Sequence, residues 1–224
     1  MCRDLGFFLS YKTINETSIS NDIKEKILKI YSDTLYNTVN GEIIDVFLPF
    51  ESIEYHKAMK ENTIYDIYIN KTAWYTIIGP LLIGAYLAGC DKESEQKLIK
   101  IGLDLGIAFQ IKDDLLGLYS ESQTLGKTIN DIKEGKQTII YKHAIDNANE
   151  EELNIIKKYY GKSNITFEES TLIADLFEKI GSRKNAEDLV EKYTNSAIYE
   201  IKNSDFQNKE LFIEFCNYLL RRKK

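Results

Sequence analysis

The sequence is poor in proline and cysteine, and these absences narrow its class. Its 224 residues include only 2 prolines, and no alternating apolar run bounded by turn residues is evident. Strands therefore find little support, and helices are favoured. The 3 cysteines are widely spaced and form no metal-ligand pattern. They indicate reduced, buried thiols in a cytoplasmic protein, and argue against a disulfide scaffold or a zinc site.

Basic charge and long hydrophobic runs are lacking as well. The formal net charge of −6 argues against a general nucleic-acid binder or a binder of anionic membranes, since both need a net basic surface. The most apolar window, residues 76–90, contains Pro80 and is shorter than the roughly 20 residues of a spanning helix, so it predicts a core helix. The start MCRDLGFFLSYKT lacks the pattern of a secretion signal. We expect a cytoplasmic protein with no membrane span and no nucleic-acid partner.

Helical spacing of apolar residues is what the sequence does contain. Between residues 23 and 39 they recur every three to four positions, and Asp22 with Glu25 marks a helix start. Thr166 followed by Glu169 predicts a capping box at the start of a later helix. No repeat, linker or shift in composition marks a domain boundary. The sequence predicts an all-α protein with a single domain over residues 1–224.

Two adjacent carboxylates, Asp113 and Asp114, stand in a helix expected over residues 98–118. Burying ionised carboxylates is costly unless a cation or hydrogen-bond donors compensate. Mg²⁺ accepts one or two carboxylates and keeps waters and phosphate oxygens as its other ligands. Taken alone, the pair also fits the solvated end of a helix. At spacings of three and four, one stripe of the helix holds Gly106, Gln110, Asp113 and Gly117.

Lysines on both sides of this helix extend the pattern. Downstream, in LGKTINDIKEGKQT, the glycine-preceded Lys127 and Lys136 bracket Asp131. Upstream, NKTAW supplies Lys71 and Thr72. Lysines close to Mg²⁺ held by aspartates suit a diphosphate, whose oxygens need several positive charges at once.

The strings NKTA, FQIKDDLLGL, GK and NDIKEGKQT, in this order, resemble the trans-isoprenyl diphosphate synthases, most of all archaeal-type short-chain enzymes such as geranylgeranyl diphosphate synthase. NGEIIDV adds weaker support. The resemblance implies a helical bundle around a central cavity, assembled as a homodimer or as a heterodimer with a related synthase. The activity that it implies is the Mg²⁺-dependent, head-to-tail condensation of isopentenyl diphosphate with an allylic diphosphate.

The resemblance also implies a role for each matched residue. The implied metal ligands are Asp113 and Asp114. The ammonium groups that bind the allylic diphosphate are those of Lys71, Lys127 and Lys136. Further substrate contacts are expected from Thr72, Phe109, Gln110 and Asp131. Asp113, Lys71 and Lys127 are the residues expected to act in catalysis.

Two departures from the family pattern leave alternatives open. The motif's usual third aspartate is Gly117 here, and the first aspartate-rich motif with its Arg-Arg-Gly is missing. The expectation is an N-terminally truncated bundle, the C-terminal two-thirds to three-quarters of the usual fold. The chain is then part of an active synthase, or a catalytically inactive regulatory subunit of a heteromeric prenyl synthase. As a third hypothesis, a terpene cyclase, Asp113, Asp114, Gly117 and Glu121 would form the metal motif.

Overall fold

The computed structural model describes residues 2–119 and 129–221, in which helices are joined by short non-helical connections. These described ranges contain no strand, so the all-α prediction is confirmed. None of their helices is long and apolar enough to cross a membrane. In chain order the elements are α1 (Cys2–Glu16), α2 (Asn21–Phe47), η1 (Leu48–Phe50), α3 (Ile53–Ala58), α4 (Asn62–Ile67), η2 (Tyr68–Ile78), α5 (Gly79–Leu87), α6 (Lys92–Tyr119), α7 (Ile129–Glu134), α8 (Ile139–Asn147), α9 (Glu150–Tyr159), α10 (Phe167–Lys179), α11 (Ser182–Lys202) and α12 (Lys209–Arg221).

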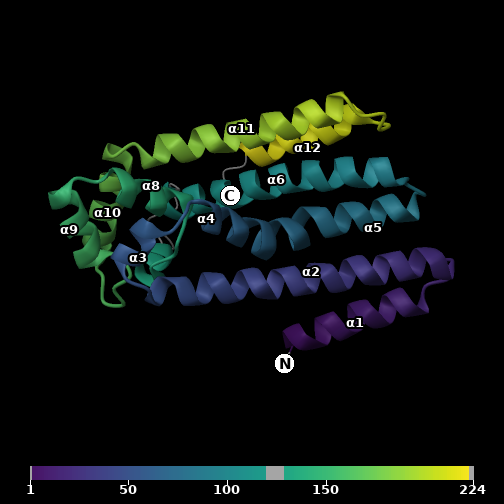
Figure 1. Ribbon diagram of the computed structural model, residues 1–224, viewed down its shortest axis with the longest axis horizontal. Coiled ribbons are helices and arrows are strands. Elements are labelled where there is room, and N and C mark those ends of the chain that lie inside the picture. Colours follow the sequence, from purple (N-terminus) through teal and green to yellow (C-terminus); the bar gives the residue numbers. More distant parts are fainter. Residues whose placement is uncertain (1, 120–128, 222–224) are drawn as a thin grey trace.

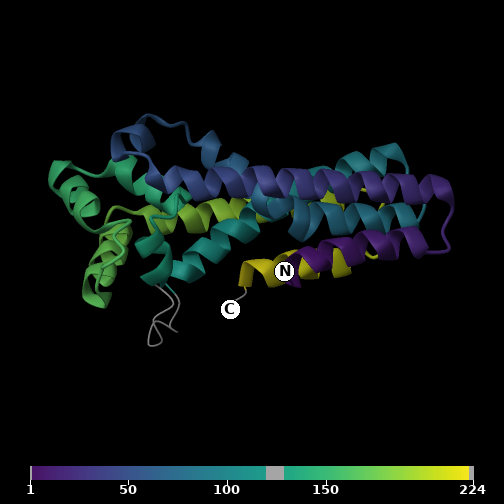
Figure 2. The ribbon, with the colours of Figure 1, turned by 90° about the horizontal axis from the view of Figure 1, so that it is seen from below.

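The long helices lie side by side along the longest axis of the molecule (Figure 1). Their order across the bundle is α11, α6, η2 with α5, α2 and α1, and α12 packs against α11 and α6. The short helices α3, α8, α9 and α10 gather at one end, where α6 and α2 also end (Figures 1 and 2). Helices α7 and α8 both contact α6, and α8 lies at the end of α6 that carries the two aspartates.

Local sequence signals set several helix ends. Thr166 accepts a hydrogen bond from the backbone N–H of Glu169, whose side chain accepts one from the N–H of Thr166, so the predicted capping box is confirmed. The start of α2 differs from the prediction. Ser20 is the capping residue and accepts from the N–H of Ile23, so the helix begins ahead of Asp22. Serine and aspartate side chains both cap helix starts well, which is why a sequence with Ser20 and Asp22 close together does not reveal which of them is the cap.

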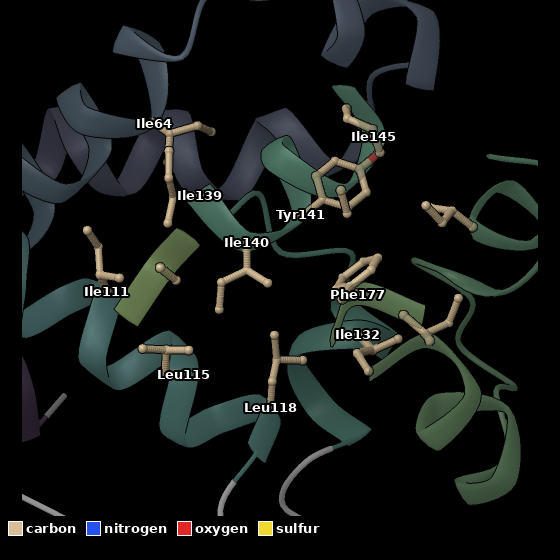
Figure 3. Packing of buried hydrophobic residues seen from close by; sticks show 14 of the residues in the cluster. Ile64, Ile111, Leu115, Leu118, Ile132, Ile139, Ile140, Tyr141, Ile145 and Phe177 are labelled. Carbon is tan, nitrogen blue, oxygen red and sulfur yellow. The ribbon is translucent and has the colours of Figure 1, made fainter. Parts of the chain in front are cut away.

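The main hydrophobic core lies at the end of the bundle where the short helices gather. Ile111, Leu115 and Leu118 of α6 meet Ile139 and Ile140 of α8 there (Figure 3). Complete burial of such a side chain contributes about 1.5–3 kcal/mol. This packing fixes the start of α8 against α6. A second cluster joins α6 to α11 and α12.

The apolar window over residues 76–90 was predicted to be one core helix, and its first part lies instead in η2, which is a π-helix. η2 packs tightly against α6 because α6 presents glycines to it. A Cβ atom at Gly102 would lie 2.7 Å from Cγ1 of Ile78. At Gly106 it would lie 2.2 Å from Cβ of Ala73. Side chains of ordinary size at these positions would push the two helices apart.

Adding a methyl group at this contact should destabilise the protein. We expect Gly106→Ala to lower the free energy of unfolding by about 1–3 kcal/mol, because the new Cβ overlaps the backbone of η2. Gly84→Ala in α5 is the matched control, since a Cβ there meets nothing within 4 Å. It should be neutral or stabilising by about 0.5–1 kcal/mol. Urea denaturation followed by circular dichroism measures both, and equal losses would contradict the proposed close contact.

Candidate functional site

The two adjacent aspartates of α6 lie in different environments. Asp113 is exposed, whereas Asp114 is only 1% exposed. Successive residues of a helix point about 100° apart, so neighbours cannot both face the same partner. The acid that continues the stripe of Gly106 and Gln110 toward η2 is Asp114, whereas Asp113 was predicted in this place.

Three hydrogen-bond donors surround the carboxylate of Asp114. Its Oδ1 accepts from Nε2 of Gln110 and from Nζ of Lys136, both at 2.9 Å. Its Oδ2 accepts from the hydroxyl of Tyr68 at 2.5 Å. Burial, and next the charge of Asp114, raise the pKa of Tyr68 well above its ordinary value, so this hydroxyl stays protonated and donates. A buried carboxylate needs such complete pairing, and here it has it.

The backbone around Lys136 is held from both sides. Gly135, with φ of 67°, takes the left-handed conformation that ends α7. The N–H of Lys136 donates to the carbonyl of Asp131 at 3.0 Å, and the carbonyl of Lys136 accepts from the hydroxyl of Tyr160. The loop between α7 and α8 therefore presents the lysine in a fixed direction, toward α6.

Lys71, on η2, forms ion pairs with two acids of α2. Its Nζ contacts Asp45, and it lies 2.9 Å from Oε2 of Glu42. Gly41 permits this approach, since a Cβ there would lie 2.3 Å from the backbone nitrogen of Lys71. Neither acid was predicted to belong to the site, although both stand in NGEIIDV. The available signal was a glycine followed closely by two acids on one helix.

Both lysines lie within one electrostatic neighbourhood. Burial opposes the charge of Lys136, but Asp114, Asp131 and Asp45 outweigh it and raise its pKa. Burial likewise opposes the charge of Lys71, and its hydrogen bonds with Asp45 and Glu42 raise its pKa in net. Asp45 thus acts on both ammonium groups, and both stay charged at neutral pH.

Asp131 occupies the space that Gly117 leaves open. A Cβ atom at Gly117 would lie 2.5 Å from Oδ2 of Asp131, and that oxygen is 4.0 Å from Nζ of Lys136. Burial raises the pKa of Asp131. Lys136 counteracts this shift, while Asp114 and Asp113 add to it. Burial is thus the main cause of the shift, and several acids oppose the effect of one lysine.

Of the three predicted ammonium groups, that of Lys136 is brought to the predicted acids, whereas that of Lys71 pairs with two acids of α2. Thr72 contacts Asp114 indirectly. Its hydroxyl donates to Oε1 of Gln110 at 2.6 Å, and this turns the amide nitrogen of Gln110 toward Asp114. Phe109 is half-buried and packs against the cluster that faces α11 and α12. Lys127 and Glu121 lie outside the described residues.

The chemistry of the site fits a hard divalent cation with an anionic ligand. In the described ranges no group of three or more His, Cys, Asp or Glu side chains could hold a metal ion on its own. Exposed Asp113 and half-buried Asp131 nevertheless supply carboxylate oxygens in the same electrostatic neighbourhood as Lys136. Mg²⁺ binds in this manner, through one or two carboxylates together with waters and phosphate oxygens. The nearby ammonium groups suit the same phosphate oxygens.

Two curated relatives show what the sequence is similar to. The geranylgeranyl diphosphate synthase of Sulfolobus acidocaldarius is 31% identical over 204 residues, which cover 89% of this chain and 59% of the relative. The farnesyl diphosphate synthase of Dictyostelium discoideum is 29% identical, over 88% of this chain and 51% of the relative. The chain thus spans about half to three-fifths of the length of these two relatives.

Solved structures share the fold. A geranylgeranyl pyrophosphate synthase from Corynebacterium glutamicum, complexed with isoprenyl diphosphate and magnesium, has a TM-score of 0.87 at 24% identity and covers 98% of this chain and 61% of its own. For the synthetase from Pyrococcus horikoshii the TM-score is 0.83 at 22% identity, over 98% of this chain and 65% of the other.

A family model described as polyprenyl synthetase matches residues 2–180. This range includes the acid pair of α6 as well as Lys71 and Lys136. With most of its length matched in this way, the chain belongs to the polyprenyl synthetase family.

Proposed function

We propose that the chain binds an allylic diphosphate with Mg²⁺ and takes part in its head-to-tail condensation with isopentenyl diphosphate, giving a short-chain product such as geranylgeranyl diphosphate. The observation that supports this most is the ion pair of Lys136 with Asp114 of α6, together with Lys71 on the adjacent η2, since Asp45 acts on both ammonium groups. The names of the relatives, geranylgeranyl and farnesyl diphosphate synthase, support the substrate class. We further propose assembly with a second copy or with a related synthase.

The two aspartates take different parts in this proposal. Asp113 is exposed, and we assign it to the metal together with the nearby Asp131. Asp114 was predicted to be a metal ligand too, but its oxygens already accept from three donors inside the protein. We therefore assign Asp114 to the internal framework, where it holds Lys136 in place.

Ionisation of the allylic diphosphate is the step that the site would favour. Bound Mg²⁺ would neutralise part of the charge that develops on the leaving diphosphate. Lys136 and Lys71 would donate hydrogen bonds to the diphosphate oxygens, with Lys71 leaving its pairs with α2. Lys127 is assigned to the same diphosphate from the sequence. Thr72 and Gln110 are assigned to positions near the reacting carbons, and Phe109 to isopentenyl diphosphate.

Turnover by the purified chain tests this function. With MgCl₂, isopentenyl diphosphate and dimethylallyl, geranyl or farnesyl diphosphate, we expect release of diphosphate and a longer prenyl product. Asp113→Asn and Lys136→Ala should lower kcat/KM by about 100-fold or more, because each removes charge stabilisation at the leaving group. Lys133→Ala is the matched control, since Lys133 is exposed on the neighbouring α7.

Two outcomes would decide against a synthase acting alone. If the chain makes no product but changes the product of an added geranylgeranyl diphosphate synthase, the regulatory-subunit hypothesis is supported. If it neither makes product nor binds inorganic diphosphate with MgCl₂, the proposed function is wrong.

The division of labour between the aspartates predicts opposite phenotypes for two neighbouring substitutions. Asp114→Asn should lower the free energy of unfolding by about 3 kcal/mol, because it breaks a buried ion pair. Asp113→Asn should change it by no more than about 0.5 kcal/mol, as is usual for an exposed side chain. Urea denaturation gives both values without added metal. Similar losses of stability for the two variants would contradict the assignment.

A further inference from the structure

The hydroxyl of Tyr68 joins three helices behind the site. Tyr68 is 2% exposed and is the first residue of η2. Its hydroxyl donates to Oδ2 of Asp114 on α6 and accepts from the backbone N–H of Ile139 at 2.9 Å. Ile139 begins α8, directly after the loop that carries Lys136. Movement of any one of these elements would stretch a hydrogen bond of this one hydroxyl.

The position of this hydroxyl is well defined by the packing around it. Ile139 lies in the main core with Ile64 and Ile111, so its N–H cannot shift freely (Figure 3). On the other side, Tyr68 and Thr72 of η2 both face α6, where they bond Asp114 and Gln110. The π-helical backbone of η2 thus presents two hydroxyl groups to one face of α6.

The charge of Asp114 is shared among its donors. One oxygen serves Gln110 and Lys136, and the other serves Tyr68. If the Tyr68 hydroxyl is removed, that buried oxygen loses the one donor described for it, and leaving such a group unpaired is costly. The carboxylate would then interact more strongly with the ammonium group of Lys136, its one cationic partner among the donors described. A lysine held more tightly by an internal acid is less able to bind an external anion.

Building on the proposed function, we propose that Tyr68 is a positioning residue of the diphosphate site, which touches no substrate itself. Its hydroxyl satisfies and orients Asp114, so that Lys136 can turn part of its hydrogen-bonding capacity to the diphosphate.

Calorimetric titration of the full chain with inorganic diphosphate in excess MgCl₂ tests this role without requiring turnover. Tyr68→Phe keeps the ring and removes only the hydroxyl. We expect it to weaken diphosphate binding about tenfold, as for the loss of a hydrogen bond to a charged group. Tyr65→Phe is the matched control and should leave the affinity within about twofold. The ring of Tyr65 stands edge-on to that of Tyr68, and its hydroxyl meets Tyr193.

A double-mutant cycle separates positioning from general structural damage. If Tyr68 acts through Lys136, Tyr68→Phe should weaken binding by less than about twofold in a Lys136→Ala background. Loss of affinity by the same factor in both backgrounds would indicate structural damage and would overturn the proposal. Circular dichroism checks the fold of each variant. Tyr68→Met, which has a similar apolar volume and no hydroxyl, replaces the phenylalanine variant if that one does not fold.

The two proposals fail in different ways. If Lys136→Ala binds diphosphate as tightly as the unmodified chain, the proposed site itself is wrong, and the role of Tyr68 falls with it. If Lys136→Ala weakens binding but Tyr68→Phe does not, only the positioning role is overturned.

Discussion

The close contact between η2 and α6 is the constraint on which the site depends. Gly102 and Gly106 let the backbone of η2 approach α6 to a distance that no larger side chain would allow. At that distance the side chains further along the same face, Gln110 and Asp114, come within hydrogen-bonding reach of η2. Gly102 and Gly106 therefore influence the site without belonging to it, since they set the distance between α6 and η2, whose polar side chains bond each other.

The same contact explains why a carboxylate is tolerated in a buried position. Once the helices are this close, Asp114 is removed from water, and its charge is strongly destabilising unless donors pair with both oxygens. Gln110 and Tyr68 supply two of the donors from within the contact. The third donor, Lys136, comes from the loop after α7, so the buried acid draws a distant segment to the site. The burial of Asp114 and the placement of Lys136 beside it therefore depend on each other.

Much of the fold was accessible from the sequence because helical periodicity and capping are local. The helix over residues 98–118 and the capping box of Thr166 depend on neighbours only a few positions away. Which aspartate faces inward is different, since the two differ by about 100° around the helix and the answer depends on where η2 lies. The pairing of Lys71 with Asp45 likewise requires that α2 and η2 be packed together. The π-helical form of η2 has no sequence pattern that would reveal it.

The charges gathered at the site favour an anion that arrives together with cations. Two ammonium groups of the described residues, on Lys71 and Lys136, stand in a neighbourhood that includes the acids Glu42, Asp45, Asp113, Asp114, Asp131 and Glu134. Acids outnumber bases, so a bare diphosphate would meet net repulsion. Lys127 would add a single positive charge. On the proposed function, a diphosphate accompanied by Mg²⁺ would reverse the balance, because the cation would offset the charge of Asp113 and Asp131. On that proposal, the charge of the site itself would make diphosphate binding depend on the metal.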